Sequence, residues 1–120
     1  MATQDKCCSI VPYFKVNDGQ LGAFRSLCER FVEKTSDESA CLYYGFSVDG
    51  DVVHCREAYA DADGLLAHLE NVGALIGEAL EISELARLEI HGPEDELQKL
   101  RQPLAELNPQ FFTLEFGFRN

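Results

Sequence analysis

A chain of 120 residues has the length of one ordinary domain, and its apolar (46%) and charged (26%) fractions exclude a disordered protein. Its net charge of −11 makes nucleic acids and anionic membranes poor partners, because an acidic surface repels phosphate groups. No apolar run is long enough to cross a membrane, and the N-terminal MATQDKCCSIV lacks the apolar core of a signal peptide. We therefore expect a cytoplasmic protein.

The five cysteines are odd in number and contain no CxxC pair. Three of them fall within apolar patterns, which is typical of reduced thiols packed in a core. A metal cluster would need cysteines in paired spacing with histidines, and this pattern is absent from the sequence. We therefore expect neither disulfides nor a bound metal.

The first third of the chain predicts a strand and then a helix. Residues Cys8–Val16 are β-branched and aromatic, and Pro12 within them indicates an edge strand or a bulge. From Gln20 to about Lys34, apolar residues recur with the i, i+3, i+4, i+7 spacing of an amphipathic helix. The residues in this stripe are Phe24, Leu27, Cys28 and Phe31. The TSDES segment at 35–39 is expected to be a polar loop.

Residues 41–60 predict a β-hairpin, because two strand-like runs flank Asp49-Gly50, a strong signal for a tight turn. A loop of these two residues places Val48 opposite Asp51 and Phe46 opposite Val53.

This register sorts the hairpin side chains into two faces. One face is aliphatic and aromatic and ends in Glu57 and Tyr59. The other is mixed and is centred on Tyr43, His54 and Arg56. The sequence does not establish which of the two faces lines a pocket.

Asp61 is a good N-cap for a second helix. Its expected buried stripe is Leu65, Leu69, Val72, Ile76 and Leu80. Gly73 and Gly77 allow either a close approach to another element or a break into two shorter helices.

Three more elements complete the chain. Residues 83–91 alternate as a strand, and Pro93 with the acidic residues after it starts a third helix that ends at about Arg101. Asn108-Pro109 is a turn signal, and residues 110–118 are expected to form a last strand.

The element order β-α-β-β-α-β predicts an α+β fold: a ferredoxin-like, split β-α-β antiparallel sheet with helices on one face. We expect one domain over residues 1–120, with a core at 8–90 and a C-terminal helix and strand at 93–119. The other sheet face is too apolar to remain in water, which favours a homodimer with the two sheets face to face. The last strand is expected to contribute apolar residues to this contact: Phe111, Phe112, Leu114, Phe116 and Phe118.

The motifs C-L-Y-Y-G-F-x-x-D-G and R-E-A-Y-x-D-A-D-x-L-x-x-H-L, between Cys41 and Leu69, resemble the antibiotic biosynthesis monooxygenase family. The order of elements over 8–90 also resembles this family, which belongs to the dimeric α+β barrel superfamily. The resemblance implies a small apolar pocket between sheet and helices. It also implies oxidation of an aromatic, phenolic or quinol-like compound without flavin, metal or other cofactor. The chain contains no Trp, which argues against the haem-degrading branch of the superfamily.

Such chemistry needs a base with a pKa near neutrality, hydrogen-bond donors for an anion, and a dry cavity. The candidate catalytic residues are His68, which matches a histidine that the family often carries in its second helix, and His54 on the mixed hairpin face. Glu57 and Tyr59 match an E-x-aromatic pattern of the family. The candidate substrate-binding residues are Tyr59, Glu57, Arg56, Tyr43 and Asn71.

Each of these residues also has a structural interpretation. His68 can be a boundary residue that packs on the sheet, Glu57 can pair with Arg56 or Arg87, and Tyr59 can be a core aromatic. The alternative function is accordingly a non-enzymatic dimeric barrel that binds a small apolar ligand or acts as an interaction module. An enclosed pocket that holds His68 and a polar group from the hairpin would favour the enzyme.

Overall fold

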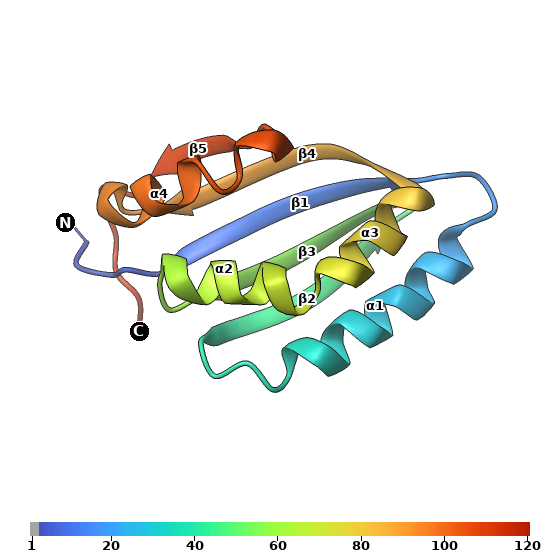
Figure 1. Ribbon diagram of the computed structural model, residues 1–120, viewed down its shortest axis with the longest axis horizontal. Coiled ribbons are helices and arrows are strands. Elements are labelled where there is room, and N and C mark those ends of the chain that lie inside the picture. The colour runs from blue at the N-terminus through green and yellow to red at the C-terminus, as the bar shows by residue number, and fades with distance from the viewer. Residues whose placement is uncertain (1–2) are drawn as a thin grey trace.

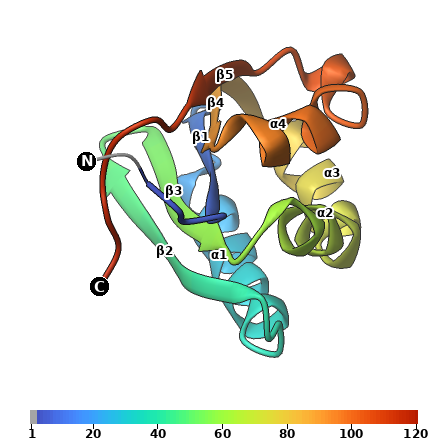
Figure 2. The ribbon, with the colours of Figure 1, turned by 90° about the vertical axis from the view of Figure 1, so that its left-hand side faces the viewer.

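The computed structural model describes residues 3–120 as one sheet covered on one side by helices (Figures 1 and 2). The elements in chain order are β1 (Cys8–Val16), α1 (Leu21–Thr35), β2 (Cys41–Asp49), β3 (Val52–Tyr59), α2 (Ala62–Asn71), α3 (Gly73–Glu81), β4 (Ser83–Gly92), α4 (Glu94–Arg101), a 3-10 turn (Ala105–Leu107) and β5 (Gln110–Thr113). The strands lie in the order β2-β3-β1-β4-β5. The predicted ferredoxin-like fold is thereby confirmed, with one addition: β5 is parallel to β4, so the sheet is mixed.

The last strand is shorter than predicted, because β5 ends at Thr113 rather than at 118. Its neighbour β4 ends at Gly92, whose carbonyl accepts a final hydrogen bond from the Leu114 amide at 2.7 Å. Beyond that point β4 provides no further residue to pair with β5. The tail instead runs beside the start of the chain, where Arg119 forms an ion pair with Asp5 at 3.0 Å.

Pro12 lies in a central strand, so its predicted edge position is wrong and its predicted bulge is correct. The register between β1 and β4 shifts between Tyr13 and Phe14. The shift places Leu85 opposite Phe14, although simple alternation would put Leu85 on the same side as Arg87. Both Phe14 and Leu85 consequently face the helices, where they line a cavity.

The hairpin forms as predicted, but its turn is one residue later. Asp49 pairs with Val52, so Gly50 and Asp51 are the two turn residues, and Gly50 has the positive φ of 60° that such a turn requires. Each β2 residue therefore pairs two positions later on β3 than expected. A shift of two residues leaves the two predicted faces unchanged, because strand side chains alternate with a period of two.

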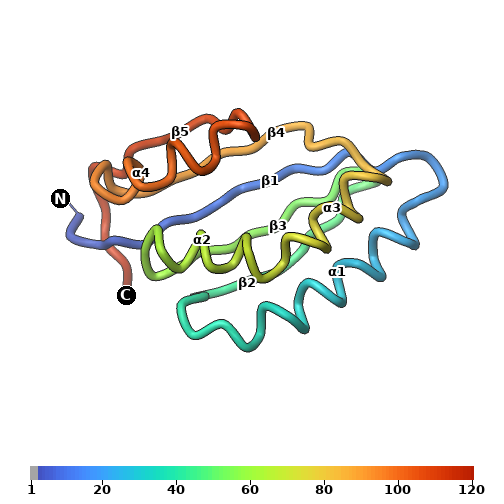
Figure 3. Tube along the Cα trace, viewed as in Figure 1, coloured from blue at the N-terminus to red at the C-terminus, as the bar shows by residue number. Residues whose placement is uncertain are grey.

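The second helical segment is broken into α2 and α3 at Val72, directly before Gly73 (Figure 3). α2 and α4 cover one core cluster, which contains Leu65 and Ile90. α1 and α3 cover a second cluster, which contains Phe24 and Val53. Within residues 3–120, no helix is long and apolar enough to cross a membrane.

Candidate functional site

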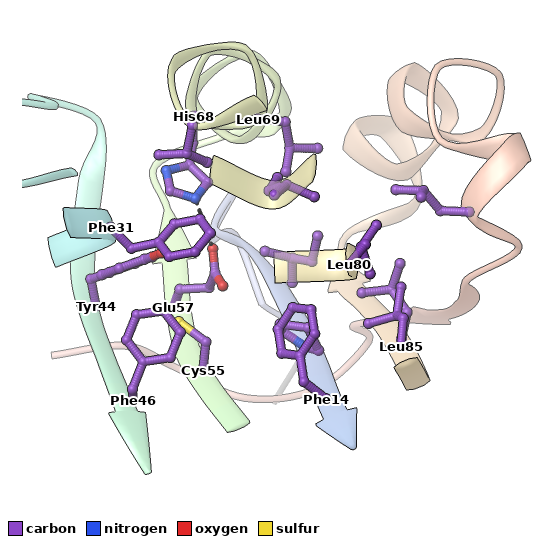
Figure 4. A pocket seen from close by; sticks show the side chains of 16 residues that line it. Phe14, Phe31, Tyr44, Phe46, Cys55, Glu57, His68, Leu69, Leu80 and Leu85 are labelled. Carbon is purple, nitrogen blue, oxygen red and sulfur yellow. Dashed lines mark ion pairs between the residues drawn. The ribbon is translucent and has the colours of Figure 1, made fainter. Parts of the chain in front are cut away.

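A cavity of about 60 Å³ lies where the two core clusters meet, between the sheet and helices α2 and α3 (Figure 4). Its walls are mainly aliphatic and aromatic side chains. They include Ile10, Phe14, Phe31, Phe46, Leu69, Val72, Ile76, Leu80, Leu85, Leu88 and Leu107. Four lining residues carry polar groups and gather at one end in Figure 4: Tyr44, Cys55, Glu57 and His68. The cavity therefore has the composition of a small-molecule site, apolar with a few convergent polar groups.

His68 reaches this cavity from α2, whose start is fixed by two local features. Asp61 caps the helix and accepts a hydrogen bond from the Gly64 amide at 2.8 Å. A Cβ at position 64 would lie 2.8 Å from the Cβ of Ala40, so glycine allows the helix to approach the loop before β2. His68 follows one turn later and is only 2% exposed.

Both ring nitrogens of His68 face a glutamate. Nδ1 lies 2.9 Å and 3.1 Å from the two carboxylate oxygens of Glu38, and Nε2 lies 3.3 Å from Oε1 of Glu57. Because a carboxylate accepts hydrogen bonds, the contact with Glu38 favours the tautomer that carries the ring proton on Nδ1. The Nε2 lone pair is then directed at Glu57 and the cavity.

Glu57 is 5% exposed and accepts a hydrogen bond of 2.6 Å from the Tyr59 hydroxyl. Burial disfavours its charged form and raises the pKa of its carboxyl from 4.5 to about 7. Burial also raises the pKa of Tyr59 well above its usual range, so the phenol stays protonated and remains a donor. Glu57 can therefore hold or release a proton near neutral pH.

Burial likewise lowers the pKa of His68, against the opposing effect of the Glu38 hydrogen bond and charge. At neutral pH, His68 is therefore an uncharged base beside a carboxyl that titrates at about 7. The two groups share an environment and titrate as a pair. Such a pair can give a proton to a bound molecule or take one from it.

The structure brings the predicted residues Glu57, Tyr59, His68 and Asn71 together. Asn71 donates from Nδ2 to Glu38 at 2.8 Å and so supports the same cluster from α2. Tyr59 is fully buried and contacts Glu57, rather than lining the cavity itself.

The predicted residues Tyr43, His54 and Arg56 lie on the opposite face of the sheet. His54 donates from Nδ1 to the Pro12 carbonyl at 2.9 Å, and its ring stacks on Tyr13 with centroids 4.4 Å apart. The Arg56 guanidinium lies 4.7 Å above the Tyr43 ring. These three residues therefore do not share a site with His68.

The structural alternative for Glu57, an ion pair with arginine, does not occur in the described part of the chain. Arg56 points to the opposite face, and Arg87 pairs with Glu89. Glu57 instead contacts His68 and Tyr59.

Sequence reasoning missed three residues of the site: Glu38, Tyr44 and Cys55. Tyr44 and Cys55 lie on the predicted aliphatic and aromatic face of the hairpin. They could have been predicted if it had been known that this face meets the helices. Glu38 lies in the polar loop after α1, where nothing in the sequence distinguishes it from its acidic neighbours. Within residues 3–120, no group of three His, Cys, Asp or Glu side chains is arranged to hold a metal ion.

Searches of family models and of curated proteins found no match to this sequence. Among solved structures, MupZ from Pseudomonas fluorescens is 50% identical, with a TM-score of 0.91 over 96% of this chain and 95% of that one. A putative antibiotic biosynthesis monooxygenase from Chloroflexus aurantiacus is 19% identical, with a TM-score of 0.61 over 72% of this chain and 92% of that one. Another from Caulobacter crescentus is 21% identical, with a TM-score of 0.58 over 72% and 88%. The resemblance noted in the sequence is thus confirmed as a likeness of fold.

Proposed function

The chain belongs to the same family as MupZ from Pseudomonas fluorescens, and on this premise we propose that it is an enzyme that transfers protons to and from a small, largely apolar compound at Glu57 and His68. The observation that carries the proposal is the Glu57–His68 pair at the end of an apolar cavity (Figure 4). A buried carboxyl with a pKa of about 7 beside an uncharged imidazole is suited to acid–base catalysis near neutral pH.

The first candidate reaction is a monooxygenation without a cofactor, which agrees with the fold of the monooxygenase relatives. His68 Nε2 removes a proton from an acidic C–H or O–H of a phenolic or quinol-like substrate. The resulting anion gives one electron to O₂, and the two radicals combine to a peroxide. Protonation and loss of water leave a carbonyl, so that CH₂ and O₂ become C=O and H₂O. The apolar walls protect the intermediates from solvent.

A second candidate is a redox-neutral reaction that begins with proton donation by Glu57, such as an addition, an elimination or an isomerisation. The supporting observation is the charge around the cavity. Among the described residues that line it, none is Lys or Arg, whereas Glu57 is an acid half-protonated near pH 7. Such a site favours protonation of an oxygen on an uncharged substrate. It disfavours an anion that has no cationic partner.

Oxygen uptake and product formation with a panel of hydroquinones, phenols and uncharged apolar oxygen compounds test this proposal. Oxygen consumption that His68→Ala abolishes would support the monooxygenase. Conversion without oxygen consumption would assign the pair to redox-neutral chemistry. Saturable binding without conversion of any compound would favour the alternative of a non-enzymatic ligand-binding protein.

The pH dependence separates the two reactions. A reaction that begins with proton removal accelerates as the pH rises through the titration of the pair, because the base is then free. A reaction that begins with donation from Glu57 slows as the pH rises through about 7, because the carboxyl loses its proton.

We further propose that the protein is a homodimer formed through the open face of the sheet. The exposed aromatic residues Phe116 and Phe118 of the C-terminal tail (72% and 78% exposed) favour a partner that covers them. Light scattering coupled to size exclusion tests this, and a monomeric mass at micromolar concentration would contradict it.

A further inference from the structure

Glu38 also faces a region of the protein surface that neither candidate reaction uses. Besides its contact with His68, it lines a surface recess with Val32, Thr35, Ser36, Cys41 and Tyr44. Tyr44 lines both this recess and the central cavity, so Glu38 and Glu57 approach His68 from two different hollows. The Glu38 side chain is 14% exposed, compared with 5% for Glu57. The imidazole therefore stands between a solvent-facing carboxylate and an enclosed carboxyl.

The loop that carries Glu38 is held by backbone hydrogen bonds on both sides. The Glu38 amide donates to the Thr35 carbonyl at 2.9 Å, and the Ala60 amide donates to the Ala40 carbonyl at 2.9 Å. Asn71 ties α2 to the same region, because Nδ2 reaches the Lys34 carbonyl at 3.2 Å as well as the Glu38 carboxylate at 2.8 Å. The carboxylate is thus placed by the scaffold, not by the histidine alone.

Four titratable side chains face the His68 ring, from two strands and one loop. They are Glu38 from the loop, Glu57 and Tyr59 from β3, and Tyr44 from β2. Neither phenol carries charge near neutral pH, because burial raises the pKa of both. Glu38 and Glu57 are therefore the groups whose charge and hydrogen bonds decide where the ring proton lies.

We infer that Glu38 is a positioning residue that fixes the ring proton of His68 on Nδ1 and thereby reserves Nε2 for Glu57 and the cavity. The inference rests on the proposed function, because it assigns Glu38 to the same proton-transfer site. The monooxygenation requires this arrangement. Proton removal needs the Nε2 lone pair, and the protonated ring that follows is stabilised by the negative charge of Glu38.

The inference is tested on the free protein, without any substrate, by ¹⁵N NMR of the histidine rings. The chain has only three histidines, so His68→Ala identifies the signals of interest. We expect the uncharged His68 of the native protein to carry its proton on Nδ1. In Glu38→Ala, the proton moves to Nε2, where Glu57 is the remaining acceptor, and the ring gains its second proton at a lower pH.

Glu38→Gln separates the hydrogen bond from the charge. Its amide oxygen still accepts from Nδ1, so the proton stays on Nδ1, but the second protonation again shifts to lower pH because the negative charge is gone. Asp37→Asn is the matched control, since it removes an exposed charge from the adjacent position and should change neither signal. If Glu38→Ala fails to fold, the titration of Glu38→Gln decides.

An Nδ1 proton and a titration curve in Glu38→Ala equal to those of Asp37→Asn would overturn the inference. A titration of Glu38→Gln equal to that of the control would overturn it as well. Neither result depends on turnover. The assignment of Glu38 can therefore fail while Glu57 and His68 remain catalytic, and it can hold if no substrate is found.

Discussion

The two faces of the sheet carry similar residue types in opposite surroundings. On the helix-covered face, His68 lies between Glu38 and Glu57 and is 2% exposed. On the open face, His91 contacts Glu89 at 2.8 Å and its side chain is 41% exposed. The same pairing of imidazole and carboxylate thus occurs once out of solvent and once largely within it.

The comparison shows that burial, not pairing, makes the first face chemically unusual. Burial raises the pKa of Glu57, whereas hydrogen bonds from His91 and Arg87 lower the pKa of Glu89. A carboxyl in water keeps its charge and gains from a cationic partner, whereas a carboxyl in an apolar cavity is partly protonated at neutral pH. The reactive proton therefore belongs to the covered face.

Alanine substitutions of the helix histidine, His68, and of the hairpin histidine, His54, should give the largest contrast in turnover. His68→Ala should reduce turnover of any substrate found by about 10²- to 10⁴-fold, the usual contribution of a general acid or base. His54→Ala should leave turnover within a few-fold, because its ring packs on Tyr13 on the opposite face. Steady-state kinetics of both variants measure the contrast, and equal losses would place chemistry on the open face.

Glu57 gives the next largest effect, on stability. Its raised pKa means that the folded protein binds more protons than the unfolded chain between pH 4.5 and about 7, so stability is lost as the pH rises through this window. The shift corresponds to about 3 kcal/mol. The free energy of unfolding of the native protein relative to Glu57→Gln should therefore fall by about this amount between pH 4 and pH 8 in urea titrations.

Glu89→Gln provides the open-face control for that experiment. The pKa of Glu89 is lowered by His91 and Arg87, so its contribution to stability is present above pH 4.5 and is lost as the pH falls. The native protein should gain stability relative to Glu89→Gln as the pH rises. The same sign of change for both variants would contradict the proposed difference between the faces.

Two glycines test how the scaffold positions His68. Gly64→Ala places a Cβ 2.8 Å from the Cβ of Ala40, and overpacking of this kind costs about 1–3 kcal/mol. Gly77→Ala meets no atom within 4 Å and should stabilise α3 by about 0.5–1 kcal/mol through helix propensity. Thermal unfolding of the two variants should move in opposite directions, and a stabilised Gly64→Ala would exclude the close approach of α2 to the loop.

The smallest effect is expected on the open face. Arg56→Ala removes a cation–π contact with Tyr43, a residue that is 43% exposed, and should change the free energy of unfolding of the protomer by about 1 kcal/mol or less. Urea unfolding at low protein concentration measures it. A loss as large as that expected for Gly64→Ala would show that this face is stabilised by more than solvated pairs.

The sequence was most informative where periodicity decides the outcome. Alternation in the hairpin placed Glu57 and Tyr59 together and apart from His54, and this sorting survived a turn displaced by one residue. Asp61 correctly marked the start of α2. Local patterns of this kind depend on backbone geometry that every strand or helix shares.

Tertiary placement is what the local patterns lacked. Alternation does not say which hairpin face meets the helices, so His54 and His68 were considered together although they lie on opposite sides. The contact of Glu38 with His68 depends on how the loop before β2 packs against α2, and no local pattern in that loop indicates this packing. The length of β5 depends on where its neighbour β4 ends.

The titration of the Glu57 carboxyl tests the central claim most directly, since it needs neither a substrate nor a partner. ¹³C NMR of side-chain-labelled glutamate, with the Glu57 signal identified by its loss in Glu57→Gln, gives the midpoint. The buried pair predicts a midpoint of about 7. A midpoint near the ordinary glutamate value of 4.5 would mean that the carboxyl is solvated and charged, and it would contradict a proton-transfer site at Glu57 and His68.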